Sequence, residues 1–283
     1  MSMSPRLMRP RQTLHPEAAS WAARVVANGG TVSGTTLSAV DKFCKAIASA
    51  GIRDLFYRMG IFAGSNLNAA LVPLYRGPSL GGTQYGNATD TNVGPFVSGD
   101  YAETGASGGL LGLSGKYLDT GFNVNNLTAS SFHLSSYIRG TQSVTTPMAL
   151  IGALFNGVTD RFRLYVNATG TPASTYTINS ELGVSTAATA TLANANAGLM
   201  LASRTLATDF TLYDDGVSAG TNNTSTSGVV SATPLLVFAR TGPTEYYTGR
   251  MAAYSIGAGM TSAQALAYSN AMTAFQTALS RNA

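Results

Sequence analysis

The stretch Phe210-Thr211-Leu212-Tyr213-Asp214-Asp215-Gly216-Val217 decides the fold. Apolar and polar residues alternate along it and lead into an Asp-Gly pair, the strongest short sequence signal for a β-hairpin. The same alternation recurs in Phe162, Leu164 and Val166. A period of two is typical of strands that bury one face, so these patterns predict a two-layer antiparallel β-sandwich.

Short runs of β-branched and aromatic residues, separated by Gly, Asn, Asp and Pro, continue this pattern from residue 79 onward. The predicted strands are 117–118, 131–138, 149–154, 162–166, 175–178, 198–203, 210–213, 235–239 and 250–256. The segment 184–196 is almost wholly Ala, Thr, Asn and Leu, and we expect an irregular link there, with an Ala-rich helical turn as the alternative. The sandwich is therefore predicted to span residues 79–260.

Residues 13–76 are predicted to form helices ahead of the sandwich. Thr13 can cap a first helix with Pro16 in its first turn, where a missing N–H costs nothing. Trp21 and Val25 are four residues apart and therefore lie on one face of this helix. We expect that face to be buried.

A second helix is predicted from apolar residues at spacings of three and four, which place them on one face. These residues are Leu37, Val40, Cys44 and Ile47. Cys44 is the only cysteine, so we expect it in the core rather than as a reactive thiol, and no intrachain disulfide can form. The two helices should form a hairpin, followed by short helical segments at 53–58 and 66–71.

The C-terminal segment 261–283 is predicted to be a helix that packs on the body of the protein. Thr261 and Gln264 have the spacing of a capping box, which marks the helix start. An apolar stripe at helical spacing follows and consists of Tyr268, Met272, Phe275 and Leu279. Contact of this stripe with a partner subunit is the alternative.

Residues 1–12 are predicted to be an extended basic arm, because Pro5 and Pro10 resist helix formation. The expected assembly contacts of the arm are Arg6, Leu7, Met8, Arg9 and Arg11. Ordering such an arm costs backbone entropy that only another surface can offset, so we expect it to lie on a neighbouring subunit of a homo-oligomer. A free tail is the alternative. Nucleic-acid binding is not expected, because no basic stripe with interleaved aromatic residues follows.

The composition indicates a rigid, weakly charged protein. Only 11% of the 283 residues are charged and the formal net charge is +4, so Ser, Thr, Asn and Gly must supply most of the polar surface. An average domain carries about 25% charged residues. No apolar run is long enough for a signal peptide or a membrane-spanning helix, so neither secretion by that route nor membrane insertion is expected.

Signals for catalysis are weak. The chain has two histidines, of which His15 precedes a proline and His133 lies in a predicted strand, and we expect both at the surface or at a sheet edge. No Gly-x-Ser-x-Gly elbow or phosphate-binding loop occurs, and Gly81-Gly82 lacks the strand-turn-helix context of a nucleotide site. The protein is therefore not expected to be an enzyme.

Four motifs in order along the chain resemble the laminin-G-like, concanavalin A-like lectin/glucanase superfamily. They are Tyr117-Leu118-Asp119-Thr120, the stretch 210–217 quoted above, Gly249-Arg250-Met251-Ala252-Ala253-Tyr254-Ser255-Ile256-Gly257 and Met260-Thr261-Ser262-Ala263-Gln264. The last two look like the closing strand and the turn into a helix that end such domains. The resemblance implies a mainly β fold, a concanavalin-like jelly roll with an N-terminal helical hairpin and a C-terminal helix.

The layout of helical hairpin, Gly-rich stretch and jelly roll also resembles uncharacterised proteins from phage and prophage structural gene clusters. This resemblance implies a non-enzymatic virion structural protein, a capsid-decorating cement or a tail or fibre protein, made in the host cytoplasm and released by lysis. It favours a trimer that contacts other virion proteins such as the shell or the tail. The alternative is a carbohydrate-binding adhesion module for a host cell-surface glycan. Candidate contacts to a glycan or a subunit are Tyr85, Tyr246 and Tyr247.

Glucanases of this superfamily carry a Glu-x-Asp-x-x-Glu motif, because nucleophile and acid must lie about 5 Å apart. The chain lacks this motif and its four glutamates are scattered, at Glu17, Glu103, Glu181 and Glu245. No cofactor is expected, although a calcium site of the fold stays open through the loop residues Asp100, Asp119, Asp160 and Asp209. Asp214 and Asp215 are expected to form a turn rather than to bind calcium.

Overall fold

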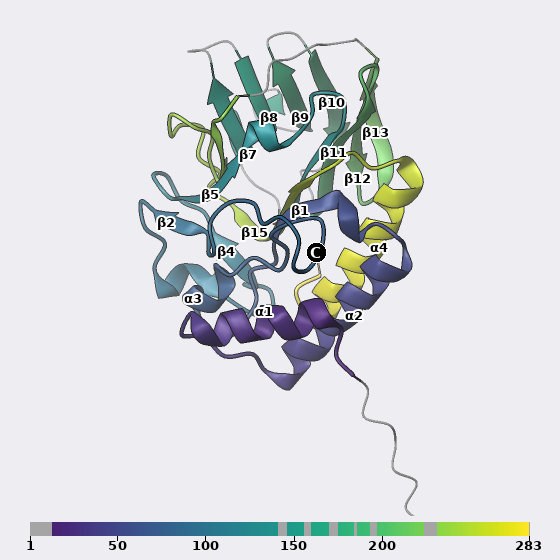
Figure 1. Ribbon diagram of the computed structural model, residues 1–283. Coiled ribbons are helices and arrows are strands. Elements are labelled where there is room, and N and C mark those ends of the chain that lie inside the picture. Colours follow the sequence, from purple (N-terminus) through teal and green to yellow (C-terminus); the bar gives the residue numbers. More distant parts are fainter. Residues whose placement is uncertain are drawn as a thin grey trace, which may run out of the picture.

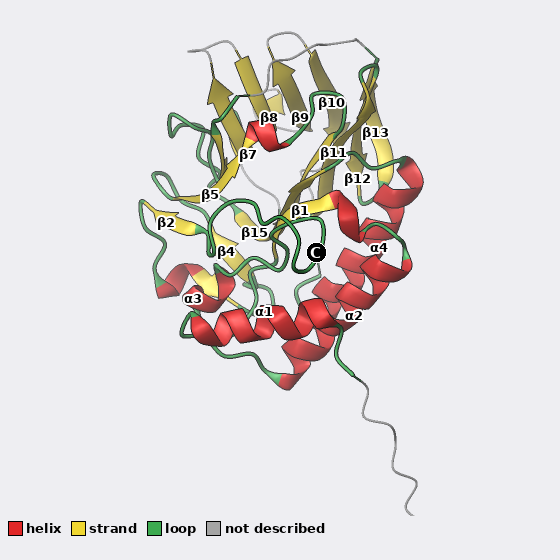
Figure 2. Ribbon diagram, viewed as in Figure 1, coloured by secondary structure: helices red, strands yellow, loops and turns green. Residues whose placement is uncertain are grey.

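Two antiparallel β-sheets pack face to face in the computed structural model, and helices cover the outer side of one of them (Figures 1 and 2). The structure describes residues 13–140, 146–155, 160–169, 175–183, 186–192, 197–223 and 231–282. The predicted fold class, a mainly β sandwich with an N-terminal helical region and a C-terminal helix, is confirmed. The assembly arm 1–12 lies outside the described residues.

The eight-stranded sheet has the order β13-β12-β11-β6-β15-β4-β3, with β1 also paired to β15. Its strands are β1 (Phe56–Gly60), β3 (Tyr101–Ala102), β4 (Gly109–Leu111), β6 (Phe132–Arg139), β11 (Gly198–Leu206), β12 (Asp209–Asp214), β13 (Val217–Asn222) and β15 (Arg250–Gly257). The Asp-Gly turn joins β12 to β13, with Asp215 at φ 47° and Gly216 at φ 83°, as this hairpin turn requires.

The seven-stranded sheet has the order β10-β9-β8-β7-β14-β5-β2. Its strands are β2 (Thr91–Val93), β5 (Tyr117–Asn123), β7 (Met148–Phe155), β8 (Asp160–Thr169), β9 (Thr175–Gly183), β10 (Thr186–Leu192) and β14 (Pro234–Val237). Every predicted strand lies within or overlaps an observed one. The prediction that segment 184–196 is irregular is wrong in part. Residues 186–192 form the edge strand β10, which pairs with β9.

The helices are α1 (Pro16–Ala27), α2 (Gly34–Ser49), α3 (Leu67–Ala70) and α4 (Ser262–Ala278), with 3-10 turns at Arg53–Leu55, Ser98–Asp100 and Val124–Asn126. The cap of α1 is His15, whose side chain accepts from the Glu17 N–H, and not Thr13 as predicted. The capping box of α4 is present as predicted. Among the described residues, no helix is long and apolar enough to cross a membrane.

The prediction of a helical segment at 53–58 is wrong after the 3-10 turn Arg53–Leu55. Strand β1 begins at Phe56 and pairs with β15. Phe56 and Met59 are fully buried there. Five residues are too few to show a strand period when both faces are buried, so local pattern could not separate a strand from a helix.

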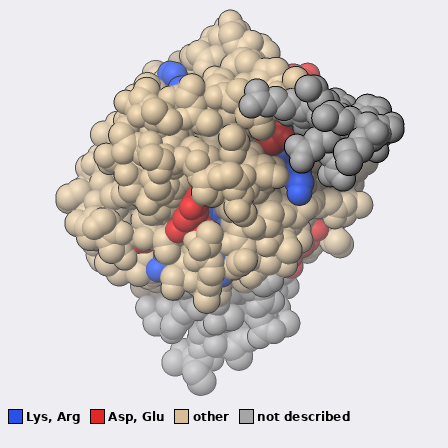
Figure 3. All heavy atoms as spheres, turned by 90° about the horizontal axis from the view of Figure 1, so that it is seen from below, with Lys and Arg blue, Asp and Glu red and all other residues tan. Residues whose placement is uncertain are grey.

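Two hydrophobic cores share the eight-stranded sheet. Met200 and Ala202 of β11 face the core between the sheets, whereas Leu199 and Leu201 face the core under the helices. Rings of α4 complete the second core, with Phe275 5.6 Å from Phe43. The predicted packing of the α4 stripe on the body is confirmed, and Trp21, Val25 and Cys44 are buried as expected. The lower face of the molecule shows few charged groups (Figure 3), as the composition requires.

The prediction that His133 lies at a surface or edge is wrong, since its side chain is fully buried. It lies on the face of β6 opposite to the core between the sheets, and the helical layer covers that face too. Its Nδ1 lies 2.6 Å from the Ala258 carbonyl oxygen and its Nε2 lies 2.9 Å from Ser255 Oγ. Burial lowers the pKa of His133 to about 4, although the Ala258 hydrogen bond opposes the shift.

This burial predicts an acid-sensitive fold. The unfolded chain binds a proton at His133 near pH 6.5 while the native chain does so only near pH 4, so stability is lost as the pH falls through this window. The free energy of unfolding is expected to fall by about 3 kcal/mol. Urea denaturation at pH 7 and pH 4.5 should show it, and His133→Gln should reduce the difference. An unchanged difference in the variant would contradict this assignment.

Candidate functional site

Half-exposed polar and aromatic side chains gather on the outer face of the seven-stranded sheet. In β5, Leu118, Thr120 and Phe122 are buried, whereas Tyr117 and Asp119 alternate with them and are half-buried. The pleat therefore directs Tyr117 and Asp119 to the face opposite to Leu118 and Thr120, although part of Tyr117 still packs against the core. The sequence predicts no functional role for Tyr117 and only a possible calcium contact for Asp119, although the alternation in Tyr117-Leu118-Asp119-Thr120 is visible in the sequence.

The loop 238–249, between β14 and β15, brings Tyr246 to this face. The rings of Tyr117 and Tyr246 lie 6.4 Å apart between centroids, tilted by 37°. Backbone hydrogen bonds hold the loop, from the Ala149 N–H to the Glu245 carbonyl at 2.7 Å and from the Tyr247 N–H to the Phe238 carbonyl at 2.8 Å. Tyr246 also donates its hydroxyl to the Pro243 carbonyl at 2.8 Å, which orients its ring.

Glu245 precedes Tyr246 in the loop, and two guanidinium groups hold its carboxylate. Its carboxylate pairs with Arg163 of β8 and, at 3.1 Å, with Nε of Arg240. The carboxylate side chain keeps 18% of its exposure. Glu245 has φ 56°, a left-handed conformation that is uncommon for a residue other than glycine and that clusters at binding sites.

The arrangement needs a residue without a side chain beneath the guanidinium groups. A Cβ at Gly152 of β7 would lie 2.8 Å from Cβ of Arg240 and 3.2 Å from Cβ of Arg163. Arg163 also covers the ring of Tyr165, with its guanidinium carbon 3.8 Å from the ring centroid. Gly152 therefore leaves the space that both arginines need, and the ring of Tyr165 packs against Arg163.

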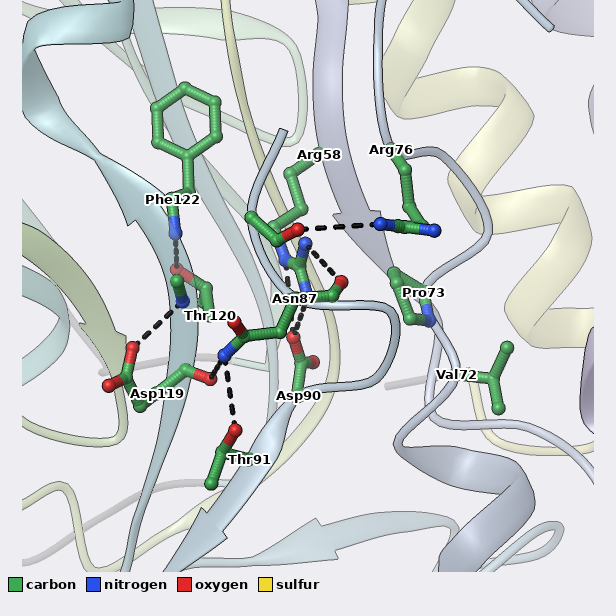
Figure 4. Close-up of polar contacts among 12 residues, drawn as sticks. Arg58, Val72, Pro73, Arg76, Asn87, Asp90, Thr91, Asp119, Thr120 and Phe122 are labelled. Atoms are coloured by element: carbon green, nitrogen blue, oxygen red, sulfur yellow. Dashed lines mark hydrogen bonds and ion pairs between the residues drawn. The ribbon is translucent and has the colours of Figure 1, made fainter. Parts of the chain in front are cut away.

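Asp119 marks the other end of this face. Asn87 donates from Nδ2 to Thr91 Oγ1 at 3.0 Å and to the Asp119 carbonyl at 3.2 Å, and Asp119 Oδ1 accepts from the Gly121 N–H at 2.8 Å (Figure 4). We call the set Tyr117, Asp119, Glu245 and Tyr246 the tyrosine strip. Its members come from β5 and from the loop 238–249.

Only one of the three predicted tyrosines lies in the strip. Tyr246 does, but Tyr247 is fully buried, with its ring 6.1 Å from that of Phe238, so the prediction that it contacts a glycan or a subunit is wrong. The two neighbours point to opposite sides of the loop. Tyr85 is half-buried and stacks on Tyr57, with centroids 5.5 Å apart.

Three of the four aspartates considered for calcium have separate partners, and the side chain of Asp160 lies outside the described residues. Asp100 pairs with Lys116, Asp209 accepts from Thr205 and Thr211, and Asp119 lies in the strip. Asp160 begins β8. Within the described part of the chain, no group of three or more His, Cys, Asp and Glu side chains is placed to hold a metal ion.

The described glutamate side chains lie at separate places. Glu17, in the first turn of α1, forms an ion pair with Arg53. Glu103 accepts hydrogen bonds from Thr36 Oγ1, near the start of α2, and from the Gly64 N–H. Glu245 lies in the tyrosine strip. The structure therefore brings no two of these three carboxylates to glycosidase distance.

No family model matches the chain, and no curated protein does. Solved structures with a similar fold include the CBM40 of the Ruminococcus gnavus IT-sialidase bound to α2,3-sialyllactose, at 12% identity and a TM-score of 0.43, with 56% of this chain and 93% of that chain covered. Domain 4 of AbnA, a GH43 extracellular arabinanase from Geobacillus stearothermophilus, in complex with arabinotriose, has 12% identity and a TM-score of 0.47, with 76% and 98% covered.

The NanB sialidase from Streptococcus pneumoniae has 13% identity and a TM-score of 0.42, with 54% of this chain covered. The chain spans 26% of the length of that sialidase. These likenesses concern the fold alone. With its two packed antiparallel sheets and the helices on one of them, the protein belongs to the class of mainly β sandwiches.

Proposed function

We propose that the protein is a non-enzymatic glycan-binding module and that the tyrosine strip is its contact surface. The observation that supports this proposal is the half-buried Tyr117–Tyr246 ring pair, together with the carboxylate of the preceding residue Glu245, which is held by Arg163 and Arg240. A sugar has apolar C–H faces that pack on aromatic rings and hydroxyl groups that donate to a carboxylate. The strip offers both kinds of contact side by side.

The strip is preorganised for such a ligand. Glu245 is fixed by Arg163 and Arg240, and Tyr246 is fixed by its bond to the Pro243 carbonyl. Side chains that are already ordered lose little conformational entropy on binding, so more of the contact energy appears as affinity. A shallow, rigid face suits an extended chain of sugar units better than an enclosed small molecule.

Tyr246→Ala should weaken glycan affinity about thirtyfold, because truncating an aromatic side chain central to a contact typically costs about 2 kcal/mol. A glycan array should identify the ligand, and calorimetry should then give the affinities. Tyr57→Ala is the matched control, since Tyr57 is also half-exposed and also packs on a second tyrosine. Loss of binding in the control alone, or no binding to any glycan, would contradict the proposal.

We also propose, from the resemblance of the layout to phage structural proteins, that the module is displayed on a virion as a cement or tail protein within a homo-oligomer. The weakly charged surface supports a role in a rigid, exposed assembly. Mass spectrometry of gradient-purified particles tests this proposal, and absence of the protein from them would contradict it.

A further inference from the structure

A cleft of about 210 Å³ lies between α1 and the loop 76–84, and no residue of the tyrosine strip lines it. Three arginines line it, Arg24, Arg53 and Arg76, together with one carboxylate, that of Glu17. The cleft therefore contains two more positive than negative side chains. Within the described ranges, no other carboxylate lines it.

Arg53 already neutralises Glu17. Its Nε donates to Glu17 Oε1 at 2.8 Å, and its Nη1 donates to the carbonyls of Phe56 and Gly77. Its guanidinium carbon lies 3.8 Å above the ring of Tyr75. Glu17 also attracts Arg24, but this attraction is weaker than the opposing effects of burial and of Arg76. Among the described residues, the ion-pair partner of Glu17 is Arg53, so neither Arg24 nor Arg76 has a carboxylate partner of its own.

Arg24 and Arg76 make no ion pair with the residues that the structure describes. Arg24 donates to the carbonyls of Pro73 at 2.6 Å and Leu74 at 2.9 Å. Arg76 makes one long hydrogen bond, from Nη2 to the Gly86 carbonyl at 3.4 Å (Figure 4). The Nε of Arg76 is buried and has no partner in the described part of the chain.

The two groups also repel each other. Burial, followed by the charge of Arg76, lowers the pKa of Arg24 to about 10, and burial also lowers the pKa of Arg76. Both side chains stay charged at neutral pH. Charges withdrawn from water are normally paired, so an anion in this cleft would relieve the repulsion and satisfy the free donors.

We propose that this cleft binds a small oxyanion, a carboxylate, sulfate or phosphate group, through Arg24 and Arg76. The planar guanidinium group presents parallel N–H donors that match two oxygens of such a group. Ser20, Ser79 and Gln84 line the same cleft and can donate further hydrogen bonds. This site is independent of the tyrosine strip and does not rest on the glycan proposal.

Thermal unfolding and calorimetry of the full chain test the proposal with sulfate, inorganic phosphate and glucuronate, against chloride and glucose at equal ionic strength. At least one oxyanion should raise the unfolding temperature saturably, and glucose and chloride should not. Sulfate and phosphate are tetrahedral, whereas glucuronate carries a carboxylate. Comparing their effects therefore shows which kind of oxyanion the cleft binds. Equal responses to chloride and to all the oxyanions would overturn the proposal, because they would indicate screening alone.

Arg76→Gln should weaken oxyanion affinity about tenfold or more, since a hydrogen bond to a charged group contributes about 1.5–3 kcal/mol. Arg139→Gln is the matched control. Arg139 also donates only to backbone carbonyls, those of Gly105 and Ala106, among its described contacts, but it lies outside the cleft. Unchanged affinity in Arg76→Gln, or equal loss in both variants, would overturn the proposal.

Ser20→Asp provides a test that does not depend on losing a donor. It places a carboxylate in the cleft, so the variant should unfold at a higher temperature without added anion and should no longer respond to sulfate or phosphate. A variant that still responds as the wild type does would overturn the proposal.

Discussion

Arg58→Met should lower the free energy of unfolding by about 3–5 kcal/mol, because it leaves a buried carboxylate without its partner. The side chains of Arg58 and Asp90 have no exposed surface, and Nη2 lies 2.6 Å from Asp90 Oδ1. Arg58 also donates to the carbonyls of Tyr85 and Asn87, so it ties β1 to the loop 85–91 (Figure 4). Urea denaturation measures the loss.

A double-mutant cycle separates the ion pair from the packing. Arg58→Met with Asp90→Leu removes both charges, and replacing a buried pair by apolar residues often costs little, so the double variant should be more stable than Arg58→Met alone. Tyr254→Phe is the mild control, because it removes only the hydroxyl that donates to Asp90 at 2.8 Å. Additive losses in the double variant would contradict the assigned coupling.

Arg281→Leu should lower the free energy of unfolding by about 2–6 kcal/mol, since each buried polar group left unsatisfied costs about 1–3 kcal/mol. Arg281 is fully buried two residues from the end of the chain. It donates to the carbonyls of Ile61 at 2.6 Å and Phe62 at 2.7 Å, and from Nε to Gln276 Oε1 at 2.6 Å. It therefore fastens the end of α4 to the segment after β1.

The neighbouring Asn282 supplies the control for this prediction. Asn282→Ala removes one partly buried bond from the Tyr137 hydroxyl and should cost only about 1 kcal/mol. Arg281→Lys should recover part of the loss, because an ammonium group keeps the charge but lacks the planar fork. Equal stability of Arg281→Leu and Asn282→Ala in urea would contradict the role assigned to Arg281.

The candidate site was predictable only in part. Tyr246 is among the candidate contacts that the sequence offers, but the sequence gives no reason to place it beside Tyr117, which is 129 positions earlier. Glu245 was noted only as a scattered glutamate. Its pairing with Arg163 and Arg240 depends on the path of the loop 238–249 over β7.

No sequence motif predicts the cleft between α1 and the loop 76–84. Arg24, Arg53 and Arg76 are far apart in the chain, and each lies in a different kind of element. Gly81 and Gly82 were considered for phosphate binding and set aside for lack of a following helix, yet they line this cleft. Convergence of such residues is a property of the packed structure.

The sequence by itself determined the elements whose pattern is local. The β12–β13 hairpin follows from Asp215-Gly216, and α4 follows from its capping box and its apolar stripe, because turn and cap geometry depend on a few adjacent residues. The two-layer sandwich follows from the alternation of many strands.

Only the tertiary structure decided which polar faces meet water. A period-two pattern separates the two sides of a strand but does not say what covers the second side. Helices and the segment after β1 cover the outer face of the eight-stranded sheet, so His133 is buried where the alternation predicted solvent. Among the residues that the structure describes, no such layer covers the tyrosine strip on the seven-stranded sheet, and Tyr117 and Tyr246 are half-buried.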